Sequence, residues 1–445
     1  MQDSCAIQLH AAGAWHDVAS VSLLGPEIEG WKAKTYTGYA VDWAFTHTGA
    51  TDAHALCAGW PVSLEPLQSP HWPVFVIDML PQGYGRQELL RRIGQVPTAG
   101  VVADWKLLLA GAGNPIGNLR VKEAADWVAT QSGPLRGFTD DEVAERGDEF
   151  TEHLAAHGLF VAGSSGVQGE WPKILLTRAE DGLLYLDHAL PDARAVEHFI
   201  VKFGRGQDPQ LASILRHEAP YMDVARQLGL RVHAPLALRR RALFIPRFDR
   251  VSQDGVVTRL AQESIATLTC LPGFEAVPSH DQVCEALIRC WTDPQAEVLE
   301  YIKRDVANLA LLNKDNHARN TAVQRDFCGR IKLTPLYDFA PMYLHPDGIA
   351  RRIRWEGNDD GRPDWGRVLD RVCELAAQVR KSMKGGRKNG PPLLDRAALV
   401  AGLKAMEPGL RQVAEQGQAM GIEPEVLNHL RPHILARAQE LVALA

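Results

Sequence analysis

One short polar segment of the chain carries three side chains that are suited to phosphoryl transfer. Residues 313–320 read Asn-Lys-Asp-Asn-His-Ala-Arg-Asn, and Asp338 ends the nearby stretch Leu333-Thr-Pro-Leu-Tyr-Asp338. Phosphoryl transfer requires a carboxylate that orients the attacking hydroxyl, together with a carboxylate and an amide that hold Mg²⁺ against the phosphates. Asp315, Asp338 and Asn320 are predicted to fill these roles in that order.

The elements on both sides of the segment favour a site over an ordinary polar turn, although Asn, Asp and His are common turn residues. Apolar residues recur with helical period before the segment, at Val298, Leu299, Ile302, Val306, Leu309 and Ala310. The polar octet therefore follows a buried helix. Ile331-Lys-Leu333 is predicted to be a short strand that delivers Tyr337 and Asp338.

A second group of residues, earlier in the chain, is suited to binding phosphates. The run Gly163-Ser-Ser-Gly-Val-Gln-Gly169 offers backbone N–H groups to phosphates, although such a run is also typical of an ordinary loop. Lys202 lies inside the apolar strand Phe199-Ile-Val-Lys-Phe203, so it needs a partner or must reach out of the sheet to water. Glu218 on the next helix is the predicted partner. Lys173 is either a second phosphate contact or a surface lysine.

Other catalytic chemistries find little support in the sequence. The sixteen histidines show no ligand spacing for zinc, and His317 is interpreted as a structural or phosphate-adjacent group. No Gly-x-Ser-x-Gly motif, paired catalytic cysteine or dinucleotide fingerprint occurs. Arg247-Phe-Asp-Arg250 ends the last strand of this region, where an adenine-holding hinge has to cross to the helical part, and backbone groups are expected to do the binding.

Composition limits the class of protein. A chain of 445 residues with 46% hydrophobic and 23% charged residues is typical of a globular protein of two or three domains, and the net charge of −6 argues against a general nucleic-acid binder. Seven scattered cysteines without a Cys-x-x-Cys pair favour a reducing cytoplasm. No signal peptide and no apolar run of about 18 residues is present, so no membrane attachment is expected.

The hydrophobic pattern predicts an α+β fold in three parts: a β-rich N-terminal subdomain (1–125), a small sheet with one helix (126–250) and a mostly helical part (251–445). Strands are expected at 19–24, 74–79, 174–176, 183–186, 199–203 and 242–248. Helices are expected at 85–93, 140–157, 211–228, 281–291, 295–312 and three times after Leu393. The basic connector 381–392, with Lys384, Arg387 and Lys388, is expected to be a solvated linker; binding of an acidic partner or RNA is the alternative.

In their order and spacing these motifs resemble the HipA family of bacterial serine/threonine kinases, the toxins of type II toxin–antitoxin pairs. The stretches that carry the resemblance are Ser165-Gly-Val-Gln168 with Pro172-Lys173, Phe199-Ile-Val-Lys202, Arg247-Phe-Asp-Arg250, and the octet 313–320 with Pro335-Leu-Tyr-Asp338. Weaker similarity at Trp60-Pro-Val-Ser-Leu64, Asp78-Met-Leu-Pro81 and Ile116-Gly117 extends it over most of residues 10–340.

The resemblance implies a two-lobed kinase-like fold that binds ATP and Mg²⁺. Asp315 is then the catalytic base, Asn320 and Asp338 are the metal ligands, and Lys202 is the ATP lysine. The implied nucleotide-binding residues are Ser165, Gly166, Val167, Gln168, Lys173, Lys202, Glu218, Pro246, Arg247, Phe248, His317, Asn320, Tyr337 and Asp338, with the 246–248 backbone at the adenine. Known members phosphorylate proteins, notably aminoacyl-tRNA synthetases, and are restrained by a helix-turn-helix antitoxin. Growth inhibition, and contact with DNA only through that partner, are therefore implied.

Three positions depart from the family pattern. Gly163 stands where the family has its autophosphorylated serine, so Ser164 and Ser165 are the candidate substitutes. Gly169-Glu-Trp171 lengthens the phosphate loop, and Pro246 replaces the usual acidic hinge residue. Gly163 removes the family's usual site of self-inactivation. The longer loop and Pro246 are expected to change the affinity for ATP without abolishing catalysis, because backbone carbonyl and N–H groups are still available to the nucleotide.

Two other functions stay open at the level of the sequence. A small-molecule kinase is one, because Asp-x-His-x-x-Asn also occurs in aminoglycoside- and choline-kinase-like folds; the β-rich region before the lobes argues against it. A non-catalytic partner in a repressor complex is the other. The joint presence of Lys202, Asp315, Asn320 and Asp338 argues against that alternative.

Overall fold

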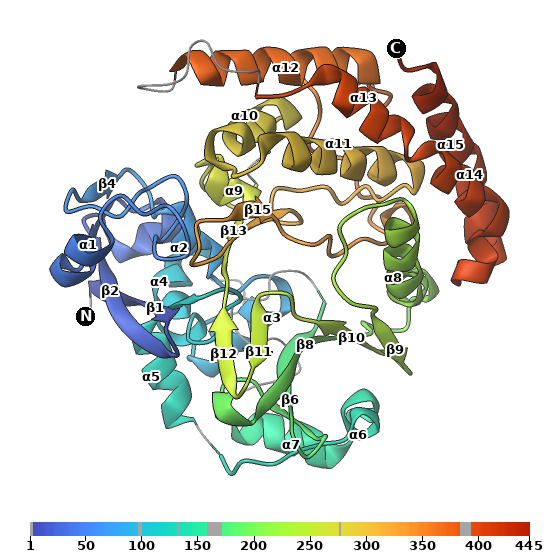
Figure 1. Cartoon of the computed structure of the whole chain (residues 1–445). Helices are drawn as coiled ribbons and strands as arrows, with labels where there is room; N and C mark the ends of the chain where they lie inside the picture. The colour runs from blue at the N-terminus through green and yellow to red at the C-terminus, as the bar shows by residue number, and fades with distance from the viewer. Residues whose placement is uncertain (1–2, 97–99, 132, 158–170, 276, 383–392) are drawn as a thin grey trace.

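The computed structural model describes residues 3–96, 100–131, 133–157, 171–275, 277–382 and 393–445. Figure 1 shows the N-terminal part in blue at one side, a sheet-containing part in cyan and green below, and a body of helices in yellow, orange and red above. We refer to them as the N-terminal subdomain (β1 to α5), the N-lobe (α6 to β10) and the C-lobe (β11 to α15). The predicted α+β class is confirmed, while the boundaries at residues 125 and 250 stay predictions.

The N-terminal subdomain is built on an antiparallel sheet of order β4-β3-β2-β1-β5. Its strands are β1 (Ser4–Ala11), β2 (Ala14–Leu23), β3 (Thr35–Tyr39), β4 (Leu67–Ser69) and β5 (Leu119–Val121). Ala12 and Gly13 both have positive φ, 49° and 78°, as a two-residue hairpin loop requires. Its helices are α1 (Val41–His47), α2 (Val74–Asp78), α3 (Gly83–Arg92), α4 (Asp104–Gly111) and α5 (Lys122–Thr130).

One predicted strand of this subdomain is wrong. The apolar stretch 74–79 forms helix α2, and its residues Val74 to Ile77 are all buried. A run that is buried on every side shows neither alternation nor helical period, so its pattern cannot separate a strand from a short helix. The predicted helix at 85–93 is confirmed as α3.

The N-lobe carries a second antiparallel sheet, of order β7-β6-β8-β10-β9. Its strands are β6 (Lys173–Ala179), β7 (Leu184–Leu186), β8 (Ala195–Phe203), β9 (Ala237–Arg239) and β10 (Ala242–Pro246), and α8 (Pro209–Gln227) is its long helix. The predicted single helix over 140–157 is wrong: α6 (Asp140–Glu145) and α7 (Asp148–Ala156) are separate. Arg146, with φ 55°, and Gly147 end the first helix and begin the second.

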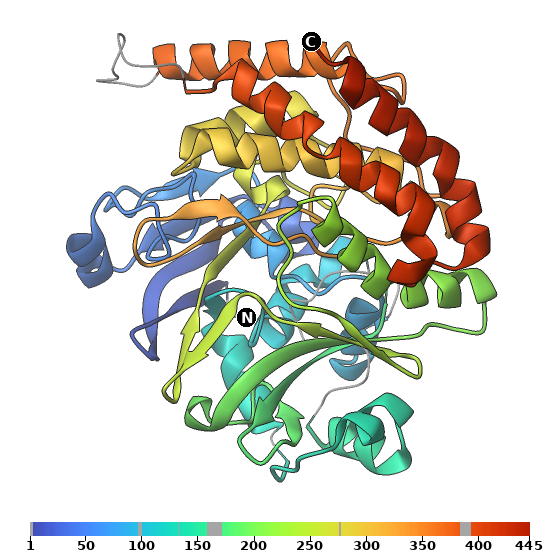
Figure 2. The same cartoon turned by 45° about the vertical axis from the view of Figure 1, so that its right-hand side comes forward.

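The C-lobe starts with the hairpin β11 (Arg250–Gln253) and β12 (Val256–Arg259) and a sheet of β13 (Ala261–Ser264), β14 (Ala322–Arg325) and β15 (Ile331–Leu333). Its helices are α9 (Ile265–Leu268), α10 (His280–Cys290), α11 (Pro294–Ala310), α12 (Trp365–Ser382), α13 (Arg396–Lys404), α14 (Glu407–Gln416) and α15 (Pro424–Ala443). In Figure 2 the orange and red helices α12 to α15 cover α10 and α11.

The helices predicted for the C-lobe, including three after Leu393, are confirmed, whereas α9 and α12 are not among the predicted helices. Helix α12 ends at Ser382, and the rest of the predicted connector, with Lys384, Arg387 and Lys388, lies outside the described residues. Among the helices that the structure describes, none has the length and apolar composition needed to cross a bilayer.

Candidate active site

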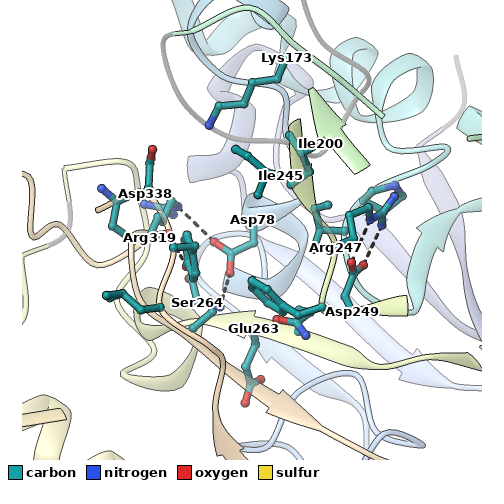
Figure 3. Close-up of a pocket in the computed structure, with 18 of the residues that line it drawn as sticks. Asp78, Lys173, Ile200, Ile245, Arg247, Asp249, Glu263, Ser264, Arg319 and Asp338 are labelled. Carbon is teal, nitrogen blue, oxygen red and sulfur yellow. Dashed lines mark hydrogen bonds and ion pairs between the residues drawn. The ribbon is translucent and has the colours of Figure 1, made fainter. Parts of the chain in front are cut away.

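A cavity of about 460 Å³ lies where the three parts of the molecule meet. Figure 3 shows its wall, with Lys173, Ile200 and Ile245 from the N-lobe and Asp338 from the C-lobe turned toward the same space. Apolar side chains on the wall come from all three parts, namely Met79, Ile116, Ile200, Ile245 and Leu336. Predicted site residues on the wall are Lys173, Glu218, Pro246, Arg247, Phe248, His317, Asn320, Tyr337 and Asp338.

Lys202 lies next to this wall and joins the two lobes. It is on the central strand β8, and its Nζ donates to Glu218 Oε2 at 2.6 Å and to Asp338 Oδ1 at 3.0 Å. The predicted partner is therefore confirmed, and a strand-edge lysine that reaches water is excluded, since 3% of the side chain is exposed. Burial alone lowers the pKa of Lys202, but Asp338 and Glu218 outweigh burial and raise that pKa.

Asp338 is held as an anion in a strained backbone conformation. Its φ of 52° lies in the left-handed region, which a residue other than glycine rarely occupies and which is often found at functional sites. Burial favours the protonated carboxyl, but the ammonium groups of Lys202 and Lys173 outweigh it and hold the pKa of Asp338 well below its usual range. Lys173 is 8% exposed, so it is not the surface lysine of the alternative prediction.

The loop after α11 fixes Asp315 and Asn320 relative to each other. Asn320 donates from Nδ2 to the carbonyl oxygen of Asp315 at 2.8 Å, and its backbone N–H donates to the carbonyl of His317 at 3.0 Å. The first bond uses the amide nitrogen of Asn320 and leaves the amide oxygen as its metal-binding atom. Burial raises the pKa of Asp315, and its side chain stays 24% exposed. It is therefore an accessible carboxylate.

His317 lies beside Asp315 and is not part of a metal cluster. Its Nε2 is 3.7 Å from Asp315 Oδ1, and burial lowers the pKa of His317. Within the described part of the chain, no three His, Cys, Asp or Glu side chains gather closely enough to hold a metal by themselves. A divalent cation here would have to combine Asp338 and Asn320 with oxygen atoms of a ligand, as Mg²⁺ does with nucleotide phosphates.

The segment 246–248 forms part of the wall between the lobes, and its one charged side chain is paired with neighbouring carboxylates. The Arg247 guanidinium is fully buried, and it pairs with Asp187 at 3.2 Å and with Asp249 at 2.7 Å. Figure 3 shows the pair with Asp249. The Arg247 N–H bonds to the carbonyl of His198 at 2.8 Å, and Pro246 has no N–H. The Phe248 carbonyl accepts from Gln324 Nε2 at 3.0 Å. The carbonyls of Pro246 and Arg247 and the Phe248 N–H are thus what this segment can offer a ligand.

Several residues of the site are not among the predicted ones, and some predicted residues lie outside the described part of the chain. Asp78, Met79 and Arg319 line the cavity. The sequence signals Asp78 and Met79 only through the weak similarity at 78–81, and it includes Arg319 in the octet 313–320 without a role of its own. In the buried network of Asp187, Asp249 and Arg247, the stretch 247–250 is part of the predicted pattern, whereas Asp187 has no local signal in the sequence. The phosphate-loop residues Gly163, Ser164, Ser165, Gly166, Val167, Gln168 and Gly169 lie outside the described residues.

Comparison with known proteins identifies the class. The chain belongs to the HipA family: residues 165–387, half of its length, match the model of the HipA-like C-terminal domain. No curated protein matches the chain significantly. The fold is similar to that of HipA in the solved complex of Shewanella oneidensis MR-1 HipA, HipB and operator DNA. That match has 17% identity and a TM-score of 0.60, and it covers 98% of each chain.

A second solved structure, the Helicobacter pylori proinflammatory kinase CtkA, matches with 14% identity and a TM-score of 0.35. It covers 56% of this chain and 89% of that chain. The predicted family and the predicted two-lobed, kinase-like fold are confirmed by the family model and by the HipA structure.

Proposed function

We propose that this chain is a protein kinase that transfers the γ-phosphoryl group of ATP to a serine or threonine hydroxyl. One observation carries the proposal: the buried Lys202 bonds to the helix residue Glu218 and to Asp338 at once, beside a loop that presents Asp315 and Asn320. A lysine positioned by a helix glutamate, a metal-binding aspartate and an aspartate–asparagine loop are the recurring parts of kinase sites.

The cavity fits the nucleotide in size and in chemistry. Its volume of about 460 Å³ lies within the range of roughly 300–1,000 Å³ that is common for small-molecule sites. Apolar side chains such as Ile200, Ile245 and Met79 suit an adenine ring, and the 246–248 backbone suits its polar edge. Lys173 and Lys202 suit the phosphates. Asp338 and the amide oxygen of Asn320 are the hard oxygen donors that Mg²⁺ prefers.

In this assignment Lys202, Asn320, Asp338 and Asp315 each have a defined role in the reaction. Lys202 aligns the α- and β-phosphates, and Asn320 and Asp338 hold Mg²⁺, which when bound neutralises charge on the phosphates. Asp315 accepts a hydrogen bond from the acceptor hydroxyl and takes its proton as the oxygen bonds to the γ-phosphorus. The bond between that phosphorus and the β–γ bridging oxygen breaks, and ADP leaves. The raised pKa of Asp315 suits this proton transfer.

Family membership extends the proposal to partners. The HipA of Shewanella oneidensis was solved with HipB and its operator DNA, and we infer a comparable helix-turn-helix antitoxin for this chain, with DNA contacted through that partner. The acceptor is then a translation-related protein such as an aminoacyl-tRNA synthetase, and the outcome is inhibition of growth from within the cytoplasm. Ser164 or Ser165 takes the place of the family's autophosphorylated serine.

The test is phosphate transfer by the purified protein with Mg²⁺ and ATP, alone and with a cell extract, followed by peptide mapping. Asp338→Asn should lower transfer by at least about 100-fold, and Asp315→Gln should lower it by about 100-fold or more. Asp326→Asn is the matched control, because Asp326 lies in the β14–β15 turn and pairs with the exposed Arg330. Transfer by Asp338→Asn at the parent rate would overturn the assignment. Phosphate found only on small molecules would point to the small-molecule kinase instead.

A further inference from the structure

Arg319, the residue before Asn320, ties the loop that carries Asp315 to the N-terminal subdomain. Its side chain is 7% exposed, and its Nε donates to Asp78 Oδ1 at 3.1 Å. Nη1 donates to the carbonyl of Gly273 at 3.0 Å, and the guanidinium lies 5.0 Å from the Phe274 ring. Figure 3 shows Asp78 reaching from the N-terminal subdomain toward Arg319 at the cavity wall. One side chain therefore connects two parts of the molecule.

The main chain of Arg319 is bonded to the other residues of the site. Its N–H donates to His317 Nδ1 at 3.2 Å, and its carbonyl accepts from the Tyr337 hydroxyl at 2.9 Å. Tyr337 directly precedes Asp338. A displacement of Arg319 is thus passed to Asn320 along the chain and to Asp338 through the Tyr337 hydrogen bond.

Asp78 is itself fixed, so it can act as an anchor. Its Oδ2 accepts from Thr267 Oγ1 at 2.6 Å and from the Ser264 N–H at 3.2 Å. It ends α2, whose preceding residues Val76 and Ile77 are fully buried. The carboxylate therefore has one oxygen bound to the C-lobe at α9 and one bound to Arg319.

We propose that Asp78 is a positioning residue for the phosphoryl transfer proposed above, and that it acts through Arg319 on Asp315, Asn320 and Asp338. This inference rests on the proposed function, because it names a further residue for that reaction. The reaction requires its groups to be held in a near-attack geometry, and a displacement of about 1 Å costs roughly 100-fold in rate. The N-terminal subdomain is accordingly a working component of the active site.

The test compares the full-length parent with Asp78→Asn, Arg319→Lys and the double variant. The kcat of Asp78→Asn should fall by roughly 10- to 100-fold, with KM for ATP little changed, because Lys202 and the 246–248 backbone stay in place. The kcat of the double variant should be no lower than that of the less active single variant, since both changes break the same Asp78–Arg319 pair. Amide hydrogen exchange over residues 315–320 should become faster in both single variants.

Glu423→Gln is the matched control, since it breaks the exposed pair of 2.9 Å between Arg216 on α8 of the N-lobe and Glu423 of the C-lobe and should change neither rate nor exchange. Parent-like kcat and parent-like exchange in Asp78→Asn would overturn the inference. If Asp78→Asn fails to fold, Arg319→Lys, which keeps the charge, decides in the same way. If the parent transfers no phosphate, the proposed function fails separately, and exchange alone then supports or refutes the link between Asp78 and the loop.

Discussion

The surroundings of two aspartates of the site, Asp315 and Asp338, shift their pKa values in opposite directions. Burial raises the pKa of Asp315, whereas Lys202 and Lys173 outweigh burial and hold the pKa of Asp338 well below its usual range. When the pKa values of two carboxyl groups in a site are driven apart in this way, one group usually exchanges a proton and the other stays ionised. The assignment of Asp315 as base and Asp338 as metal ligand agrees with this division.

The raised pKa of Asp315 predicts that removing its charge stabilises the protein. Its pKa lies above the ordinary value of 3.8 when the chain is folded, so the stability contributed by the protonated carboxyl is complete below that pH and is lost as pH rises through the folded pKa. At pH 7 the parent lacks this stability. Asp315→Asn, which cannot ionise, should melt higher than the parent by on the order of 1 °C, and the gain should shrink as pH falls.

Thermal melts over a pH series check this prediction. Asp326→Asn provides a control of opposite sign: hydrogen bonds from Arg330 and Cys328 outweigh burial and lower the pKa of Asp326, so its removal should lower the melting temperature at neutral pH. An Asp315→Asn variant that melts at or below the parent at pH 7 would show that burial does not dominate at Asp315.

Elements with a clear local pattern were predictable, and contacts between distant elements were not. The lysine inside an apolar strand and the glutamate on the next helix pointed to each other because β8 and α8 are consecutive. In contrast, Asp78 and Arg319 lie 241 positions apart, so only the packing of α2 on the C-lobe brings them together. The pattern of 74–79 predicts a strand instead of helix α2, because a segment that is buried on every side shows no helical period.

The lysine on β8 is predicted to be as important for stability as for nucleotide binding. Lys202→Met removes the cation that bonds to both the buried Glu218 and Asp338 and leaves Lys173 as the remaining lysine near them, and breaking a buried pair typically costs about 3–5 kcal/mol. The melting temperature should fall markedly. The double variant Lys202→Met with Glu218→Gln should recover part of the loss, because it removes one of the two carboxylates. If the double variant melts below Lys202→Met, charge repulsion is not the cause.

At the scale of the whole molecule, polar side chains rather than apolar surface alone join the N-terminal subdomain to the lobes. The Gly117 N–H donates to Asp249 Oδ2 at 2.8 Å, and the Ala58 N–H donates to Glu263 Oε2 at 3.0 Å. Arg325 on β14 is fully buried, and it donates to the carbonyls of Ala55 at 3.1 Å and Leu56 at 3.3 Å. Such directional bonds fix how the three parts are oriented. A cavity that all three parts line requires this fixed orientation, because its walls belong to different parts.

Arg325 is therefore predicted to decide whether the subdomain and the C-lobe unfold together. Arg325→Ala leaves the buried Glu263, 3.8 Å away, without its cation and several carbonyls without a donor, which typically costs about 3–5 kcal/mol. Calorimetry should show an earlier transition for the N-terminal subdomain, and limited proteolysis should cut that part first. Arg330→Ala, on the same hairpin but 73% exposed, should melt like the parent. If Arg325→Ala unfolds in one transition at the melting temperature of the parent, apolar packing alone holds the N-terminal subdomain against the lobes. That packing then also keeps the wall that this subdomain contributes to the cavity in place.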